Sequence, residues 1–291
     1  NLFGNHQHGF RSSRSTATAL LTASVKWRQK KEEGKYQGVL FFDLSAAYDM
    51  LNKDLFIKKA QIYGITGSAI NWLKSYLTGR SQAVSIGNEQ SSILPLTDGT
   101  PQGSACSCTL FALFVGDLGL RAEDSLPTMY ANDTCHTVVA DSLNELTVKL
   151  EIAGEKILQY FTGNRMVANA EKTGLLILRP TLSKSEHVSI SLAGTTIQES
   201  TDQKVLGVHV QNDFKYVKHI KKVKADLQYA LSVLRQLRKS LGKKELSQVA
   251  SGIFTSHLRY CLPVFASSYL RTGESDAYST LMQELQVCQN D

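Results

Sequence analysis

The sequence has few cysteines and no long apolar run, and each shortage excludes a class of protein. Its five cysteines are an odd number and no signal-peptide pattern precedes them, so we expect reduced thiols in an intracellular protein. The most apolar stretch, TLFALFVGDLGL, is interrupted by Asp117 and is too short to span a membrane. We therefore expect a soluble protein with no membrane partner.

Repeats and paired metal-binding motifs are also lacking. Cys106, Cys108, Cys135 and His136 do not have paired CxxC spacing, which argues against a zinc site. No internal repeat or low-complexity segment is present. The chain starts without Met and stops within the apolar-periodic segment TLMQELQVCQND, so we expect an excerpt of a longer protein.

The 291 residues are 42% hydrophobic, which is enough for one large domain or two smaller ones. The net charge of +6 is modest, but the basic residues are clustered. Apolar residues recur every three or four positions over 214–241, which predicts a helix. The segment 215–244 carries ten Lys or Arg against the single acid Asp226. We predict a boundary near Asn212, followed by a helix with one apolar and one cationic face.

The first half of the chain mixes helical and strand patterns. Ser15 is a possible N-cap of a helix that ends at Gly34. The short apolar run YQGVLFFDL predicts a buried strand that ends at Asp43. Helical patterns cover 54–63 and 68–77, and QAVSIGNEQSSILPL predicts a hairpin.

A second predicted strand end carries Asp133. The loop DGTPQGSACSC leads into a helix, and in MYANDTCHTVVA two short strands flank Asn132 and Asp133, a favourable pair for a hairpin turn. Ser142 and Glu145 predict a capping box for the next helix, and further strands are expected at TGLLIL and KVLGVHV. The predicted fold class is α+β with an all-helical C-terminal part.

Aspartates at two strand ends, Asp43 and Asp133, have a chemical and a structural interpretation. Mg²⁺ prefers a few carboxylates together with waters and substrate phosphates. Two such ions about 4 Å apart can activate a hydroxyl and stabilise a leaving pyrophosphate, which predicts two-metal nucleotidyl transfer. Strand-end aspartates also cap a following helix or turn, so spacing alone leaves both interpretations open.

Seven segments together resemble one family. They are, in order, QHGFRSSRSTATAL, GVLFFDLSAAYDMLN, GTPQGSACSCTLF, MYAND, NAEKT, KVLGV and HLRYCLPVF. Their order, spacing and residue identities resemble those of the reverse transcriptase domain of non-LTR retrotransposons of the LINE or jockey kind, over residues 8–265. Group II intron maturases and telomerase share this fold, but RSTATAL is closer to the retrotransposon group.

The resemblance implies a right-hand polymerase, with an antiparallel palm sheet covered by helices, partial fingers and a small all-α thumb. It divides the chain into fingers at 1–38 and 66–98, palm at 39–65 and 99–211, helical thumb at 212–270 and a C-terminal tail at 271–291.

It also implies catalytic positions. Asp43 and Asp133 resemble metal-binding aspartates, and Asn132 stands at the position of another carboxylate. Lys172 resembles the lysine suggested to protonate the departing pyrophosphate, or else it is a solvated lysine.

Five positions resemble nucleotide-binding residues. Tyr48 resembles the aromatic gate that excludes a 2′-hydroxyl, or else it is a core tyrosine. Gln102 and Gly103 match the loop beneath template and nucleotide, or else form an ordinary turn. Arg11 and Arg14 resemble fingers residues near phosphates, or else form a solvated pair.

Nucleic-acid contacts are implied at the end of the palm and along the cationic helix. Leu206 and Gly207 resemble the primer-grip turn, or else are ordinary strand residues. A helix that binds phosphates would lose affinity steeply with salt, whereas a solvated face would not. The basic residues assigned to this contact are Lys218, Lys221, Lys222, Arg235 and Arg238.

Asn132 departs from the family pattern, because active relatives have YADD where this chain has YAND. An amide contributes no negative charge and bridges two cations poorly. We expect Asn132 to spare the fold, since asparagine tolerates the left-handed conformation of a tight turn, but to impair the chemistry. The departures at Ser107, Cys108 and Gly116 point the same way.

The expected function is addition of deoxynucleotides to a primer 3′-hydroxyl with two Mg²⁺ ions, or Mn²⁺, impaired in this copy. The alternative is a catalytically dead nucleic-acid-binding module. The expected partners are an RNA or DNA template with a DNA primer, and dNTPs; the oligomeric state does not follow from the sequence. Location is nuclear by analogy with the family, or otherwise cytoplasmic.

Overall fold

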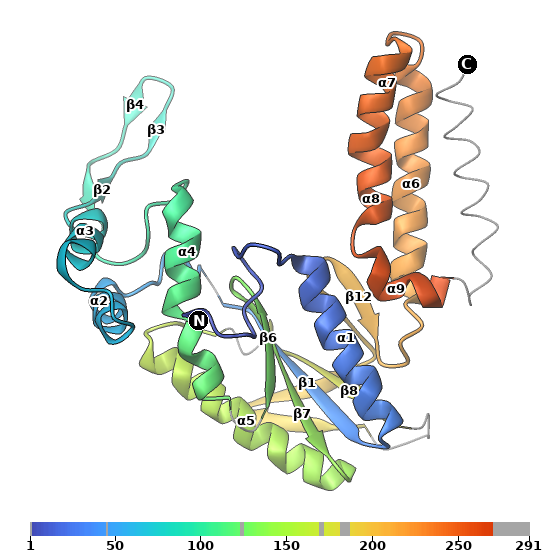
Figure 1. The fold of residues 1–291 in the computed structure, drawn as a ribbon, viewed down its shortest axis with the longest axis horizontal. Coiled ribbons are helices and arrows are strands. Elements are labelled where there is room, and N and C mark those ends of the chain that lie inside the picture. Colours follow the sequence, from blue (N-terminus) through green and yellow to red (C-terminus); the bar gives the residue numbers. More distant parts are fainter. Residues whose placement is uncertain (1, 45, 123–124, 169–171, 181–186, 270–291) are drawn as a thin grey trace.

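The computed structural model describes residues 2–44, 46–122, 125–168, 172–180 and 187–269. The predicted tail at 271–291 and the first three residues of NAEKT lie outside the described residues. A sheet lies at the base of the molecule, and one arm rises from each side of it (Figure 1).

A six-stranded sheet carries its strands in the order β6-β7-β1-β8-β10-β9. Neighbouring strands are antiparallel except for the parallel pair β8 and β10. The strands are β1 (Tyr36–Phe42), β6 (Leu126–Tyr130), β7 (Asp133–Ala140), β8 (Gly174–Leu178), β9 (Ser189–Leu192) and β10 (Thr195–Ser200). The unbroken apolar run of β1 suits its central place, because both faces of a central strand are covered. The predicted strand that ends at Asp43 is thereby confirmed.

Helices lie on the sheet and in both arms (Figure 1). They are α1 (Thr16–Glu32), α2 (Lys53–Ile62), α3 (Gly67–Leu77), α4 (Ala105–Phe114), α5 (Leu143–Gly163), α6 (Val217–Leu237), α7 (Lys243–Ala250), α8 (Ser256–Arg259) and α9 (Leu262–Tyr269), with a 3-10 turn at Gly116–Leu120 and a π turn at Ser251–Thr255. Ser15 caps α1 as expected. None of the helices in the described residues is both long enough and apolar enough to cross a membrane.

The central strand is held between two apolar layers. On one face, β1 packs against α5 so closely that a Cβ on Gly38 would lie 2.5 Å from the Leu150 side chain. On the other face lies α1, whose Trp27 indole N–H donates a 2.7 Å hydrogen bond to Thr137 of β7. Because both faces are fixed, the end of β1 that leads into Asp43 has a defined position.

The first arm consists of α2, α3 and two small, exposed, two-stranded sheets (Figure 1). β2 (Ser81–Gln82) pairs with β5 (Leu94–Pro95), and β3 (Ser85–Ile86) pairs with β4 (Glu89–Gln90). The hairpin expected from QAVSIGNEQSSILPL is thereby confirmed.

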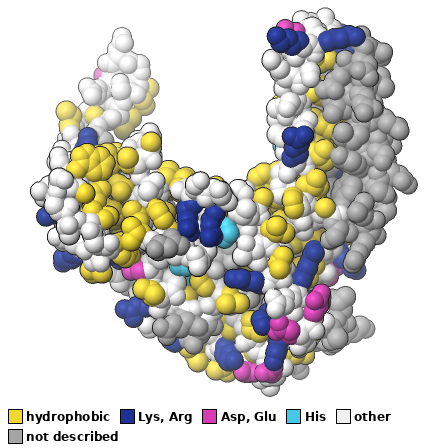
Figure 2. Space-filling model, in the orientation of Figure 1, with side chains coloured by type: hydrophobic (Ala, Val, Ile, Leu, Met, Phe, Trp, Pro, Cys, Tyr) yellow, Lys and Arg dark blue, Asp and Glu magenta, His cyan; other side chains and the backbone are white. Residues whose placement is uncertain are grey.

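The second arm begins with the hairpin of β11 (Asp202–Val205) and β12 (Val208–Gln211) and continues into α6 to α9. The apolar face of α6 packs against α7 and the short π-helix at Ser251–Thr255, with Leu227, Leu231 and Phe254 buried between them. Figure 2 shows a deep hollow between this arm and the first one.

Some details differ from the sequence-based expectations. KVLGVHV forms the β11–β12 hairpin rather than one strand, because Leu206 and Gly207 both have positive φ. α6 ends at Leu237 rather than at residue 241. Ser142 caps α5 as predicted, since its hydroxyl accepts the N–H of Glu145, but the Glu145 carboxylate accepts the N–H of Asp141 instead of that of Ser142. The β9–β10 hairpin has no predicted counterpart, since strands this short give few alternations of apolar and polar residues.

A buried ion pair joins β10 to the end of β8. The side chains of Arg179 and Glu199 are 10% and 5% exposed, and two guanidinium nitrogens donate to the two carboxylate oxygens. Val188 N–H donates to the same carboxylate at 3.1 Å. Burial opposes ionisation of Glu199, but the hydrogen bonds from Arg179 and Val188 outweigh it, so the pKa of Glu199 lies below its ordinary value of 4.5.

Glu199→Gln should lower the free energy of unfolding by about 3 kcal/mol at neutral pH, because it removes the carboxylate charge to which two nitrogens of the buried Arg179 guanidinium donate. The folded-state pKa of Glu199 lies below its unfolded value, so this contribution is complete above pH 4.5 and is lost as the pH falls through the folded pKa. Denaturant unfolding at several pH values measures both effects. Asp141→Asn, which removes an exposed pair with Lys35, is the control and should leave stability nearly unchanged. Equal stabilities of the wild-type and Glu199→Gln chains at pH 7 would contradict the prediction.

Candidate active site in the cleft

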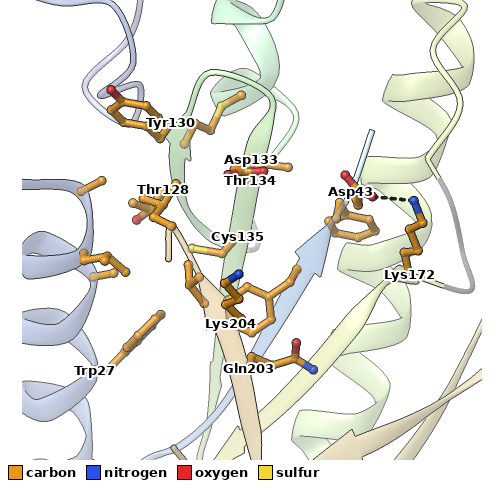
Figure 3. A pocket seen from close by; sticks show the side chains of 18 residues that line it. Trp27, Asp43, Thr128, Tyr130, Asp133, Thr134, Cys135, Lys172, Gln203 and Lys204 are labelled. Atoms are coloured by element: carbon orange, nitrogen blue, oxygen red, sulfur yellow. Dashed lines mark ion pairs between the residues drawn. The ribbon is translucent and has the colours of Figure 1, made fainter. Parts of the chain in front are cut away.

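The end of β1 and the start of β7 bring two carboxylates together at the floor of the hollow. The antiparallel register pairs Phe42 with Thr134, so Asp43 and Asp133 are the next residues on the two neighbouring strands. Both line one cavity of about 220 Å³, and Figure 3 shows that they reach it from different sides. Sheet pairing thus unites two residues that are distant in the sequence.

Asp43 and Asp133 have different electrostatic partners. The Asp43 carboxylate forms an ion pair with the Lys172 ammonium at 3.3 Å, drawn as a dashed line in Figure 3. The pKa of Asp133 is raised above its ordinary 3.8, because partial loss of hydration disfavours its charge and because Asp43 repels it. Lys204 of β11 lines the same cavity. Two carboxylates and two ammonium groups therefore share this site.

The hairpin that carries Asp133 turns one residue earlier than expected. Tyr130 pairs with Asp133 across β6 and β7, so the turn consists of Ala131 and Asn132. Ala131 has the left-handed φ, 58°, and Asn132 does not have a positive φ. The expectation that asparagine supplies the left-handed residue is therefore wrong. The backbone of the turn does not require asparagine at position 132. Another residue, such as aspartate, therefore fits this position without a change of the turn.

The carboxylates of Asp43 and Asp133 fit a divalent cation. They supply the oxygen ligands that hard cations prefer, and the raised pKa of Asp133 reflects negative charge that a cation would offset. The described residues contain no group of three or more His, Cys, Asp or Glu around one point. Since Asn132 adds no charge, this donor set suits one ion better than two.

Of the predicted nucleotide-binding residues, Tyr48 interacts with Asp133, whereas Gln102 binds Asp49. The half-buried Tyr48 ring packs against Phe111, with ring centroids 4.9 Å apart. Burial raises the pKa of Tyr48 to about 12, with contributions from Cys108 and then from the Asp133 charge. The Gln102 amide donates to Asp49 at 2.6 Å. Asp133 and Tyr48 therefore interact electrostatically across the cleft floor.

Gly103 has φ 79°, and a Cβ there would meet no atom within 4 Å. Glycine is therefore favoured at this position by the backbone conformation and not by crowding.

Arg11 and Arg14 have structural partners within the N-terminal segment. The Arg11 guanidinium donates to the carbonyl oxygens of Gly4 and Gln7, at 2.5 and 3.0 Å. Arg14 donates to the carbonyl of Asn5 at 2.8 Å. Both arginines therefore order the segment that precedes α1, and their contact with phosphates stays a prediction.

The predicted primer-grip turn is held by a tyrosine of the second arm. Leu206 and Gly207 form the tight turn between β11 and β12, with φ 46° and 81°. The Tyr260 hydroxyl donates to the Leu206 carbonyl at 2.7 Å, and a Cβ on Gly207 would lie 3.2 Å from the Tyr260 ring. Tyr260 belongs to the quoted segment HLRYCLPVF, but only the fold shows that it touches this turn.

The basic residues assigned to α6 occupy different surroundings along the helix. Lys218 forms an ion pair with Asp202 at 2.8 Å. Lys222 lines a second cavity of about 340 Å³ together with Gly207. Figure 2 shows basic side chains at intervals along this arm. Lys221, Arg235 and Arg238 are exposed on the same helix and its C-terminal end.

The four residues considered for zinc lie on two elements. Cys106 is exposed and Cys108 half-buried on α4, and Cys135 is buried in β7, as is His136. The imidazole of His136 lies between the hydroxyls of Ser125 and Thr134, at 3.1 and 3.2 Å, and burial lowers its pKa to about 3. His136 is therefore a core histidine.

Three residues of the site carry no individual assignment from the sequence. Lys204 and Tyr260 lie within the motifs KVLGV and HLRYCLPVF, so motif membership was a usable signal. Gln7 is fully buried and binds the backbone of Ala131 through its carboxamide. Only its place as the first residue of the QHGF segment marks it in the sequence.

Sequence comparison relates the chain to polymerases of mobile elements. Residues 1–210 match the family model of reverse transcriptase (RNA-dependent DNA polymerase). The chain is 26% identical over 227 residues to the RNA-directed DNA polymerase from mobile element jockey of Drosophila melanogaster, covering 74% of this chain and 24% of that protein. It is 26% identical over 295 residues to the retrovirus-related Pol polyprotein from type-1 retrotransposable element R1 of Bradysia coprophila, covering 97% and 28%. The chain thus spans about a quarter of the length of these relatives.

Comparison with solved structures identifies the fold. Apo telomerase from Candida tropicalis superposes with a TM-score of 0.52 at 13% identity, covering 99% of this chain and 52% of that chain. Telomerase of the same organism in complex with the TWJ fragment of telomeric RNA gives 0.50 at 14% identity, covering 99% and 47%. The expected right-hand α+β fold is confirmed. The curated relatives confirm the resemblance to polymerases of non-LTR retrotransposons.

Carbon-13 NMR titration should give Asp133 a pKa above 3.8, and Asp43→Asn should lower it by removing a repelling charge. Since the folded-state pKa exceeds the unfolded one, ionised Asp133 costs stability above the folded pKa, and this cost disappears as the pH falls below the unfolded value. Asp43→Asn should therefore also reduce the pH dependence of stability in this range.

Asp141→Asn, just beyond the far end of β7, serves as the control for this titration. It should leave the Asp133 pKa unchanged. An Asp133 pKa that Asp43→Asn does not move would show that the two carboxylates are not coupled.

Proposed function

We infer that this chain, which belongs to the reverse transcriptase (RNA-dependent DNA polymerase) family, is the polymerase domain of a longer retrotransposon protein and that Asn132 impairs its catalysis. Its reaction would be the template-directed addition of deoxynucleotides to a primer 3′-hydroxyl. The observation that carries this proposal is the carboxylate pair Asp43 and Asp133 on one cavity in the cleft floor.

Each residue of the cleft floor has a proposed role. Asp43 and Asp133 would hold Mg²⁺ or Mn²⁺, and a cation bound there lowers the pKa of a primer hydroxyl and stabilises a leaving pyrophosphate. Lys172, which forms an ion pair with Asp43, would donate a proton to the pyrophosphate. Tyr48 would form the floor under the sugar, supported from behind by Phe111.

The proposed impairment follows from the charge in the cavity. Lys172 already offsets part of the Asp43 charge and Lys204 lines the same cavity, so the two carboxylates supply little negative charge for a second dication. An aspartate at position 132 would supply that charge, whereas the amide of Asn132 supplies none. We therefore propose that the chain binds one divalent cation well and two cations poorly.

The proposed partners are an RNA or DNA template with a DNA primer, and dNTPs. The hollow between the two arms supports this proposal, since it is open and the second arm that borders it carries basic side chains at intervals (Figure 2). Telomerase of the same fold has been solved with a telomeric RNA fragment. The turn at Leu206 and Gly207 would support the primer end.

Domain roles are proposed on the same basis. Residues 1–38 and 66–98 would form the fingers, 39–65 and 99–211 the palm, and 212–270 the thumb. The arrangement of two arms about the six-stranded sheet supports this division in outline (Figure 1). Its bounds differ from those of the structural elements, because 1–38 includes α1 and the start of β1, which belong to the sheet and its cover, and 39–65 includes α2, which lies in the first arm. Nuclear residence is proposed only from the need of such elements to reach chromosomal DNA.

A catalytically dead nucleic-acid-binding module is the second candidate function. The observation that favours it is the same amide at position 132, because Asn132 removes charge from the metal site without being needed by the turn. This candidate keeps the cleft and the cationic arm but does not extend a primer.

Asn132→Asp should raise Mg²⁺-dependent primer extension by about a hundredfold or more, since even residues that only support a metal ligand contribute about 10- to 100-fold. Mn²⁺ should relieve part of the defect in the unmodified chain. The control Asn88→Asp makes the same chemical change on the exposed β3–β4 turn and should have no effect. Robust extension by the unmodified chain would refute the impairment, and no gain from Asn132→Asp would favour the binding module.

Template-primer affinity should fall steeply with salt if α6 contacts phosphates. Replacing both Lys221 and Lys222 by Gln should reduce the slope of log affinity against log salt by about 1.8, since each phosphate contact contributes about 0.9. The matched control replaces Lys149 and Lys156 of α5, which lies against the sheet outside the second arm (Figure 1). An unchanged slope in the α6 variant would place the nucleic acid elsewhere.

A further inference from the structure

The N-terminal segment forms an additional edge beside the hairpin that carries Asn132 and Asp133. The N–H of His8 donates to the Met129 carbonyl at 2.8 Å, and the N–H of Met129 donates to the His6 carbonyl at 2.8 Å. These bonds make a parallel bridge between Gln7 and Met129. β6 is the edge strand of the sheet, so its outer main-chain groups are available for this pairing. The bridge brings Gln7 to the hairpin tip.

The carboxamide of Gln7 binds both main-chain groups of Ala131. The N–H of Ala131 donates to Gln7 Oε1 at 3.0 Å, and Gln7 Nε2 donates to the Ala131 carbonyl at 3.3 Å. The N–H of Gly9 donates to the same Oε1 at 2.8 Å. Gln7 is fully buried, so water does not replace these bonds.

Ala131 is the residue of the tip that needs support. Its φ of 58° lies in the left-handed region, which residues with a Cβ avoid. Gly9 lies directly behind it, and a Cβ on Gly9 would be 2.4 Å from the Ala131 nitrogen. The contact between Gln7 and Ala131 therefore depends on glycine at position 9.

We propose that Gln7 is a positioning residue, which holds Ala131 in its left-handed conformation. It thereby fixes the direction of the backbone at residues 132 and 133 and the position of the Asp133 carboxylate relative to Asp43. The inference rests on the proposed function, because it gives the hairpin the task of presenting metal ligands. Gln7 itself touches neither carboxylate in this role. It acts only through the backbone of Ala131.

Hydrogen exchange and Mn²⁺ binding test the proposal on the full chain without any polymerase assay. Gln7→Met keeps the size of the side chain and removes its hydrogen bonds. Amide exchange at residues 132–134 should become about tenfold faster, because buried main-chain groups at the tip lose their partners. Mn²⁺ affinity, measured by electron paramagnetic resonance, should fall about tenfold as the ligands lose their fixed direction.

Gln37→Met is the matched control. Gln37 is also fully buried, and its amide donates to the Trp27 carbonyl at 2.8 Å, but it pairs with Val139 at the other end of β7. It should leave exchange at 132–134 and Mn²⁺ affinity unchanged. Equal effects of Gln7→Met and Gln37→Met would overturn the proposal in favour of general loosening.

Ala131→Gly separates positioning from packing, because glycine adopts positive φ without support. In the Gln7→Met background it should recover most of the lost Mn²⁺ affinity, and no recovery in a folded double variant would overturn the proposal. If Gln7→Met does not fold, Gln7→Glu replaces it. Its carboxylate still accepts the N–H groups of Ala131 and Gly9, but it lacks the donor to the Ala131 carbonyl and repels that oxygen, so exchange at 132–134 identical to wild type would overturn the proposal. Faster exchange in the variants of a chain that binds no Mn²⁺ would refute the metal site and retain the role of Gln7.

Discussion

The antiparallel pairing of β1 with β7 is the interaction on which the rest of the site depends. Because Phe42 pairs with Thr134, the two aspartates that follow and precede these residues reach the same cavity. β1 lies between the apolar layers under α5 and α1, so its register is fixed by burial on both faces. A slip of one residue would turn Asp43 toward an apolar layer. The hydrophobic core therefore sets the geometry of a polar site.

Charge at this site is offset only in part within the protein itself. Lys172 pairs with Asp43 and Lys204 lines the same cavity, whereas Asp133 keeps a raised pKa because it has lost part of its hydration and because Asp43 repels it. The turn has its left-handed φ at Ala131, so Asn132 is compatible with the fold. The proposed loss of two-metal chemistry would follow from the missing charge at position 132 and not from a change of the turn.

Local patterns predicted most elements because their periodicity is strong. The α1 cap at Ser15, the central strand and the β3–β4 hairpin all follow from short-range chemistry. The features that the sequence did not predict are turns whose positive φ angles depend on hydrogen bonds from distant residues. The turn at Leu206 exists with a positive φ because Tyr260 binds its carbonyl, and the turn at Ala131 because Gln7 binds both of its main-chain groups. No local pattern encodes a partner so distant in the chain.

The sequence by itself determined the family, the fold class and the two strand-end aspartates, since motif order and hydrophobic periodicity are properties of the chain read in one direction. Tertiary structure decided which residues meet. It placed Lys172 on Asp43, Lys204 in the same cavity and Gln7 behind the hairpin tip. In the structure the left-handed residue is Ala131 and not Asn132. Strand register and the hydrogen bonds from Gln7, rather than residue preference, fix the conformation of this two-residue turn.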